Sequence, residues 1–111
     1  MSEYLFSYGT LQKEQTQIEL FGRVLQGRPD ILQGYRISLI EITDEIFLAR
    51  GENRQQQTLI PSGEKKDIIN GTVFEITPEE LLQADRYEPN NYVRMKMMLE
   101  SGKEAWIYTA G

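Results

Sequence analysis

The feature that most restricts the fold of this chain is a series of short apolar segments separated by turn-forming residues. Each is rich in aliphatic or aromatic residues and has the length of a strand. These segments are residues 4–7, 34–42, 71–76, 92–99 and 105–108. The chain has 111 residues, which is enough for one core. The pattern therefore predicts a single α+β domain over residues 1–111, formed by a small mixed, antiparallel-rich β-barrel with a few short helices.

Two segments carry the signals of helices. Residues 13–22 have an irregular apolar face, and Gly22 or Gly27 would end that helix. Residues 77–80, Thr-Pro-Glu-Glu, combine an N-cap, a proline at the first helical position and a capping-box glutamate. This second helix is expected to run to about Tyr87.

The middle of the chain has weaker signals. Residues 34–42 carry apolar side chains on both faces toward their far end, which favours burial on both sides there. Residues 45–49 are interpreted as a strand that pairs with this segment across a short turn. Residues 51–67 are polar and favour a surface loop, in which residues 58–60 could add a short strand.

The composition excludes several kinds of chemistry. The chain has no histidine and no cysteine, so it has no Ser–His relay, no thiolate nucleophile and no metal held by either residue type. Proton transfer would depend on Asp, Glu, Lys, Tyr or bound water. The net charge of −5 argues against nucleic acid as a partner. Because no apolar stretch could span a bilayer and residues 1–4 lack the features of a signal peptide, we expect a cytoplasmic protein without a membrane partner.

Two motifs indicate a binding site. Residues 8–11, Tyr-Gly-Thr-Leu, directly follow the first strand, and Gly9 allows a ligand to approach the backbone closely. Backbone N–H groups freed at such a strand end can bind an anion. The second motif, residues 85–94, joins the end of the second helix to the next strand and has the sequence DRYEPNNYVR.

Together with residues 71–76, these motifs resemble the gamma-glutamylcyclotransferase-like family, including its gamma-glutamylamine cyclotransferase branch. Residues 34–36 and 105–108 are also similar to that family, and all these segments occur in the family's order. The resemblance implies that the α-amine of a gamma-glutamyl compound attacks its own side-chain carbonyl. This reaction releases 5-oxoproline and the attached amine or amino acid. The implied partner is a small gamma-glutamyl molecule, and no metal or cofactor takes part.

The resemblance also implies roles for particular residues. Glu88 matches the catalytic glutamate, which accepts a proton and then donates it. The backbone of residues 8–11 would cradle the amino acid end of the substrate. The expected substrate-binding residues are Tyr8, Gly9, Thr10, Leu11, Tyr92 and Arg94.

The chemistry of Glu88 is consistent with this role. One carboxylate can serve both proton transfers if its pKa is raised toward neutrality. Glu88 lies just past the expected end of a helix, where the helix dipole disfavours a negative charge. Nearby tyrosines would partly desolvate the carboxylate, which raises its pKa as well.

Each candidate also has a purely structural interpretation. Glu88 could be a solvated residue at a helix end, Gly9 could only form a turn, and Arg94 could pair with Asp85 or Glu88. The alternative function is therefore a non-catalytic module that binds a small ligand or a protein on the same fold. A buried salt bridge from Arg94 or Arg86 to Glu88 would favour that alternative.

Ala84 stands where a leucine commonly precedes the aspartate in the family, and two segments also differ from the family's usual appearance. They are residues 13–15, which follow the Tyr-Gly-Thr-Leu motif, and residues 55–57, which are three consecutive glutamines. Both are expected at the mouth of the pocket. The identity of the leaving amine is therefore left open by the sequence.

Overall fold

The computed structural model describes residues 2–110, so Met1 and Gly111 of the expected domain lie outside the described range. Strands predominate, and the helices are short. In chain order the elements are β1 (Glu3–Ser7), the 3-10 helix η1 (Thr10–Gln12), α1 (Glu14–Phe21), β2 (Gln26–Gln33), β3 (Tyr35–Glu41), α2 (Glu45–Ala49), β4 (Gln55–Pro61), β5 (Ile68–Ile76), α3 (Pro78–Tyr87), β6 (Tyr92–Met98) and β7 (Glu104–Ala110).

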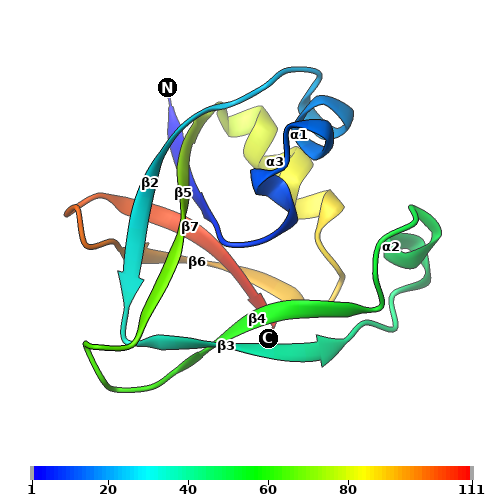
Figure 1. The fold of residues 1–111 in the computed structure, drawn as a ribbon. Helices are drawn as coiled ribbons and strands as arrows, with labels where there is room; N and C mark the ends of the chain where they lie inside the picture. Colours follow the sequence, from blue (N-terminus) through cyan, green and yellow to red (C-terminus); the bar gives the residue numbers. More distant parts are fainter. Residues whose placement is uncertain (1, 111) are drawn as a thin grey trace.

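The strands form a five-stranded sheet in the order β2-β5-β1-β7-β6 and a two-stranded sheet of β3 and β4. Only β1 and β7 pair in parallel within residues 2–110, and the other pairs are antiparallel. The two sheets curve toward each other, with α1 and α3 at one end and β3–β4 at the other (Figure 1). Ala110 N–H donates to Thr58 Oγ1 (2.8 Å), where β7 approaches β4. The predicted α+β class and mixed, antiparallel-rich arrangement are confirmed, and the barrel-like structure is not closed.

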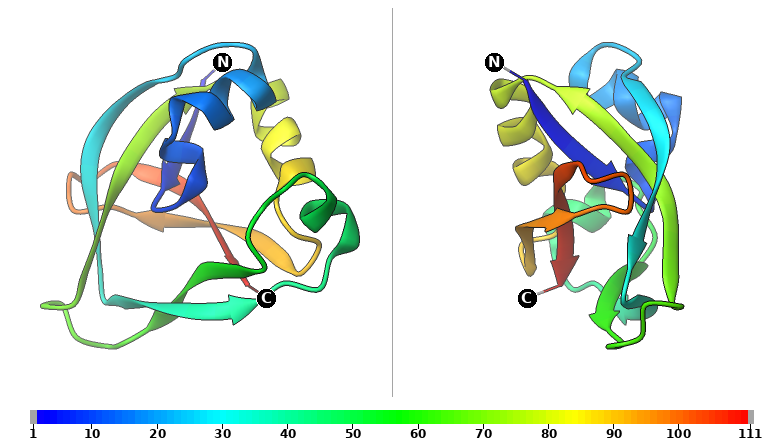
Figure 2. Two further views of the ribbon diagram at one scale, coloured as in Figure 1. Left: turned by 45° about the vertical axis from the view of Figure 1, so that its right-hand side comes forward. Right: turned by 90° about the vertical axis from the view of Figure 1, so that its left-hand side faces the viewer.

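A corner at Gly34 produces this curvature. The chain leaves β2 in the five-stranded sheet and enters β3 in the two-stranded sheet through this single residue, which has a φ of 86°. Gly34 N–H donates to the Asp67 carbonyl, and Ser62 N–H donates to the Gly34 carbonyl (both 2.8 Å). The segment β4–β5 therefore follows β2–β3 around the bend, as the two views in Figure 2 show.

The prediction of a strand at residues 45–49 was wrong, because this segment forms α2. The Asp44 carboxylate caps the helix by accepting hydrogen bonds from Ile46 N–H (3.0 Å) and Phe47 N–H (3.3 Å). The partner of β3 is instead β4, which occupies residues 55–61 of the predicted loop and extends the short strand suggested at 58–60. Gln55 and Gln57 are exposed on β4, so their polarity concealed the strand.

Two other expectations about strands also needed correction. Residues 26–33 form β2, although their polar sequence gave no strand signal; their backbone pairs with β5 along its whole length. The far end of β3 is covered on one face only. Ile42 is fully buried just beyond the strand, whereas Ile37 and Leu39 are 44% and 59% exposed, because no element within residues 2–110 covers the outer face of this two-stranded sheet.

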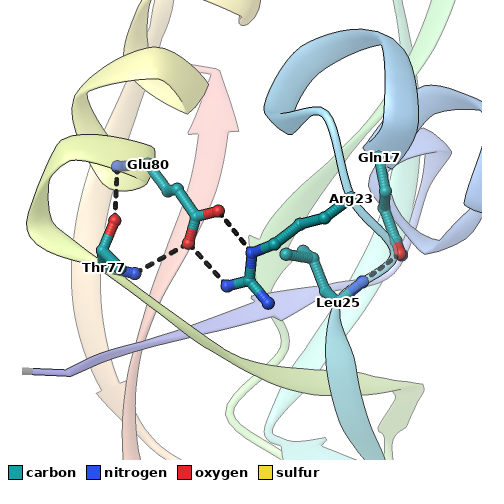
Figure 3. Close-up of polar contacts among 5 residues, drawn as sticks. All are labelled: Gln17, Arg23, Leu25, Thr77 and Glu80. Carbon is teal, nitrogen blue, oxygen red and sulfur yellow. Dashed lines mark hydrogen bonds and ion pairs between the residues drawn. The ribbon is translucent and has the colours of Figure 1, made fainter.

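Both predicted helices are present. Gly22 ends α1 in the left-handed conformation, with a φ of 74°. At the start of α3, Thr77 and Glu80 form the predicted capping box. The Arg23 guanidinium makes two 2.7 Å bonds to the Glu80 carboxylate, and this holds the pKa of Glu80 below its ordinary value. Figure 3 shows how this ion pair fastens the α1–β2 connection to α3.

Strand β1 lies at the centre of the core and is buried on both faces. Leu5 (0% exposed) packs in a cluster that includes residues of α3, and Phe6 (1% exposed) packs in a second cluster with residues of β2, β4, β5 and β7. Two-sided burial explains why residues 4–6 are continuously apolar. The end of β1 at Ser7 is therefore held firmly where the Tyr-Gly-Thr-Leu motif begins.

Candidate active site

A cavity of about 300 Å³ lies where the end of β1 meets the end of α3. Its walls include residues 6–11, Glu88 and Tyr92, together with residues 55–57 of β4. The structure thus brings the Tyr-Gly-Thr-Leu motif and Glu88 together, although they lie about eighty residues apart in the sequence. It also places the three glutamines beside them.

The Tyr-Gly-Thr-Leu segment forms one wall and is fixed at several points. Tyr8 hydroxyl donates to the Tyr108 carbonyl (2.7 Å), and Gln12 N–H donates to the Gly9 carbonyl (3.1 Å). Leu11 is buried, which anchors the far end of the segment. The N–H groups of Thr10 and Leu11 begin η1, and neither has a hydrogen-bond partner within residues 2–110.

Glu88 follows the last turn of α3 and opens into the cavity. Its backbone N–H donates to the Ala84 carbonyl (3.1 Å), and Pro89 prevents the helix from continuing. The half-buried carboxylate accepts no hydrogen bond from any group between residues 2 and 110. Burial raises its pKa to about 8, with further contributions from the negative charges of Glu52 and Asp85.

Tyrosine side chains surround this carboxylate. Tyr92 hydroxyl donates to the Gln57 carbonyl (2.7 Å), and burial together with Glu88 raises the pKa of Tyr92 to about 12. Burial likewise raises the pKa values of Tyr8, Tyr87 and Tyr108. These phenols are therefore neutral at physiological pH, and they enclose Glu88 without supplying a compensating positive charge.

Arg94 lies outside the cavity wall. Its guanidinium donates two hydrogen bonds to the Asp85 carboxylate (2.8 and 3.0 Å) and stacks on the Trp106 ring, with its carbon 4.4 Å from the ring centre. Tyr108 hydroxyl also donates to Asp85, at 2.5 Å. Arg94 was expected either to bind the substrate or to pair with Asp85 or Glu88. In the structure it pairs with Asp85, and no ion pair joins it to Glu88.

Sequence reasoning missed several residues near this site. Phe47, Asn53 and Tyr108 line the cavity, and Glu52 adds negative charge near Glu88. Phe47 falls within the strand predicted at residues 45–49, and Glu52 falls within the predicted surface loop. A possible signal was Asp44, which is able to cap a short helix. Such a helix would fix the position of the chain that follows it, including Glu52.

Two structural findings concern other kinds of function. No cluster of three or more acidic side chains suited to a metal ion occurs in the part of the chain that the structure describes. No helix within residues 2–110 is both long and apolar enough to cross a membrane.

The fold and the cavity define a small α+β protein with an unpaired carboxyl group facing a ligand-sized space. The chain belongs to the gamma-glutamyl cyclotransferase, AIG2-like family, whose sequence profile it matches over residues 5–111. This match confirms the resemblance found in the sequence. No curated protein sequence matches the chain significantly.

Solved structures share this fold at low sequence identity. A solution structure of At3g28950.1 from Arabidopsis thaliana has a TM-score of 0.73 and 19% identity, with 99% of this chain and 62% of that chain covered. A protein named gamma-glutamyl cyclotransferase has a TM-score of 0.76 and 15% identity, with 100% and 68% covered. YkqA from Bacillus subtilis has a TM-score of 0.68 and 24% identity, with 100% and 36% covered. The chain thus spans less than two thirds of the first and third of these proteins.

Proposed function

We propose that this protein is a cofactor-independent cyclotransferase that releases 5-oxoproline from a gamma-glutamyl amine or gamma-glutamyl amino acid. The observation that carries the proposal is the position of Glu88: its carboxylate opens without an ion-pair partner into the cavity, whose wall includes residues 8–11. Membership of the gamma-glutamyl cyclotransferase, AIG2-like family supports the same reaction class.

The proton balance of the reaction suits a single carboxyl group. The α-nitrogen of the substrate attacks the side-chain carbonyl carbon, and the carbonyl electron pair moves onto oxygen. When this pair returns, the bond to the departing nitrogen breaks. The α-nitrogen loses two protons to become the ring amide, and the departing nitrogen gains two to leave as an ammonium ion. Because there is no net exchange with solvent, Glu88 can accept a proton at one nitrogen and return it at the other.

The surroundings of Glu88 favour both directions of transfer. A carboxylate with an ordinary pKa is too weak a base to take a proton from an ammonium group, whereas a pKa of about 8 matches it to that task. The N–H groups of Thr10 and Leu11 are suitable donors for the substrate carboxylate or for the oxyanion. Ring closure is intramolecular, so a cavity that holds the substrate folded supplies much of the acceleration.

The non-catalytic module is less well supported. It would be favoured by an ion pair that locks Glu88 to Arg94 or Arg86, but Arg94 is bound to Asp85 and no ion pair within the described residues joins Arg86 to Glu88. The deciding experiment is an assay of 5-oxoproline release by the purified protein, over a panel of gamma-glutamyl amino acids, gamma-glutamyl-ε-lysine and gamma-glutamyl amines. Binding of these compounds without any release would support the module.

The pH dependence of release should report on Glu88. Below a pH of about 8 its carboxyl group is increasingly protonated and cannot accept a proton, so kcat/KM should fall tenfold per pH unit on the acid side. The α-amine of the substrate titrates in a neighbouring range, so its pKa should be measured separately by NMR. An acid limb centred near pH 4, the ordinary range of glutamate, would contradict the proposed environment.

Replacing Gly9 with valine should weaken binding more than folding. No protein atom lies within 4 Å of a Cβ atom built at Gly9, so the substitution adds its first carbon in open space rather than against the core. Gly9 lines the cavity, however, and a branched side chain there would obstruct the approach of a ligand to the backbone. Calorimetric titration with 5-oxoproline, together with thermal melts, measures both effects, with Gly9→Ala as the smaller control. Unchanged affinity in Gly9→Val would mean that this segment serves only as a turn.

A further inference from the structure

Residues of the connection between α2 and β4 bind Tyr87, the residue that precedes Glu88. Arg50 donates to the backbone carbonyls of Tyr87 (2.6 Å) and Arg86 (3.1 Å), and its guanidinium carbon lies 5.5 Å from the centre of the Tyr87 ring. At the other end of the ring, Tyr87 hydroxyl donates to the Glu52 carboxylate (3.0 Å). Two residues of this short connection therefore hold Tyr87, Arg50 at its backbone carbonyl and ring and Glu52 at its hydroxyl.

The hydrogen bond between Tyr87 and Glu52 continues, through the Tyr87 hydroxyl, to Thr10 on the opposite wall of the cavity. The Tyr87 hydroxyl uses its hydrogen for Glu52, so the 3.2 Å contact to Thr10 has the Thr10 hydroxyl as donor. The resulting chain runs from Thr10 through Tyr87 to Glu52. It joins the Tyr-Gly-Thr-Leu segment, the end of α3 and the α2–β4 connection, three segments that surround Glu88.

The charged and titratable groups near Glu88 come from several elements. They are Glu52 in the α2–β4 connection, Asp85 and Tyr87 on α3, Tyr8 after β1, Lys13 before α1, Tyr92 on β6 and Tyr108 on β7. Asp85 is neutralised locally, because Arg94 and Tyr108 both bind it. Glu52, by contrast, has no lysine or arginine nitrogen within 4 Å in the described part of the chain.

The two arginines that share a cavity with Glu52 form no ion pair with its carboxylate. Arg50 and Arg86 line, with Glu19 and Glu52, a neighbouring cavity on the other side of Tyr87. The Arg50 guanidinium donates hydrogen bonds to the backbone carbonyls of Tyr87 and Arg86 rather than to the Glu52 carboxylate. A carboxylate held by the Tyr87 hydroxyl, with no ion-pair partner within the described residues, therefore lies behind the Tyr87 ring.

We propose that Glu52 is a positioning residue of this site: its carboxylate holds the Tyr87 hydroxyl toward Thr10 and keeps a second negative charge beside Glu88. Its importance for turnover rests on the proposed cyclotransferase function, whereas its effect on Glu88 does not. Among charged groups, Glu52 makes the largest contribution to the raised pKa of Glu88, after burial itself. In this proposal Glu52 supports the acid–base role of Glu88 through its charge and its contact with Tyr87, and it does not contact the substrate itself.

The test is to measure the pKa of Glu88 directly, by carbon-detected NMR of its carboxyl group, in the wild type and in Glu52→Gln. Glutamine can still accept the Tyr87 hydrogen bond through its amide oxygen, so the variant removes the charge and keeps the contact. The pKa of Glu88 should fall by on the order of one unit. Glu64→Gln, which makes the same change on an exposed loop, should leave it unchanged. A Glu52→Gln protein in which Glu88 titrates as in the wild type would overturn the proposal.

Tyr87→Phe provides a second, independent variant. It removes the hydroxyl that links Thr10 to Glu52 but retains the buried ring, so the Glu52 charge is present without being held. The pKa of Glu88 should then fall by less than in Glu52→Gln, and the affinity for 5-oxoproline should fall because Thr10 has lost its partner. If affinity and titration both match the wild type, Glu52 is not a positioning residue.

Rate measurements separate this proposal from the proposed function. In Glu52→Gln the acid limb of kcat/KM should move to lower pH by the same amount as the pKa of Glu88. The expected shift in the NMR titration without any 5-oxoproline release would uphold the role of Glu52 and contradict the cyclotransferase function. Release with an unshifted acid limb and an unshifted titration would contradict the role of Glu52 alone.

Discussion

Glu88→Gln is expected to lower the rate of 5-oxoproline release by roughly 10²–10⁴-fold, the usual contribution of a general acid–base group. Glutamine keeps the size of the side chain but cannot carry the proton between the two nitrogens. Binding should change much less, because the donors expected to hold the substrate are the N–H groups of Thr10 and Leu11. Turnover and 5-oxoproline affinity of the same preparation measure the two effects.

The matched control is Glu75→Gln, the same chemical change on an exposed face of β5 away from the cavity. It should retain wild-type turnover. Wild-type turnover in Glu88→Gln would remove Glu88 from the mechanism. The proton transfers would then fall to Asp85, to a tyrosine or to a lysine, since the chain has no histidine or cysteine.

Thermal melts of Glu88→Gln provide a second readout with a definite sign. The pKa of Glu88 is about 8 in the folded protein and about 4.3 in an unfolded chain, so folding favours its protonated form. The stability contributed by this preference is fully present below pH 4.3 and is lost as the pH rises through 8. Glutamine stays neutral throughout. The difference in Tm between the variant and the wild type should therefore increase in favour of the variant between pH 4.3 and 8.

The parts of this protein that could be predicted from sequence depend on neighbouring residues. The capping box of α3 places its N-cap, proline and glutamate within four positions, and the interactions they form are local. The end of β1 was likewise visible as an apolar run that stops at a glycine. Because Pro89 follows Glu88, the end of α3 was also predictable.

The missed features depend on partners far away in the sequence. Strand β2 is polar and includes Pro29, and only its pairing with β5, some forty residues later, makes it a strand. In α2 the Asp44 cap outweighs the strand preference of an apolar segment. The contact between Tyr87 and Glu52 spans 35 residues and has no local signature. Sequence reasoning therefore placed the acid–base candidate but not the carboxylate expected to tune it.

Gly71→Ala is expected to have the largest effect on folding, because the backbone of Ser7 and the ring of Phe6 lie too close to Gly71 to leave room for a methyl group. Ser7 leads directly into the cavity wall. Gly71 lies in β5 beside the end of β1. A Cβ atom built there would lie 2.5 Å from the Ser7 carbonyl oxygen and 2.6 Å from Cζ of Phe6. Ser7 O belongs to the backbone, and the Phe6 ring is 1% exposed and enclosed by the core, so neither can move away freely.

The substitution should therefore lower the free energy of unfolding by about 1–3 kcal/mol, the usual cost of overpacking a core. For a domain of this size, that corresponds to a fall in Tm of about 4–12 °C. Gly9→Ala is the matched control, because no protein atom lies within 4 Å of its added Cβ atom. Equal melting temperatures for Gly71→Ala and the wild type would contradict the close approach.

A second variant shows which of the two neighbours resists the added methyl group. In Gly71→Ala combined with Phe6→Leu, the ring contact is removed and the contact with the Ser7 carbonyl is retained. If the backbone contact dominates, Gly71→Ala should cost as much stability in a Phe6→Leu background as it does in the wild type, and β1 must shift to accommodate the methyl group. Since Ser7 leads directly into residues 8–11, such a shift would displace the N–H groups of Thr10 and Leu11. Gly71→Ala should then bind 5-oxoproline more weakly than the wild type even at temperatures where both are fully folded. This result would connect the packing of the central strand to the geometry of the candidate site.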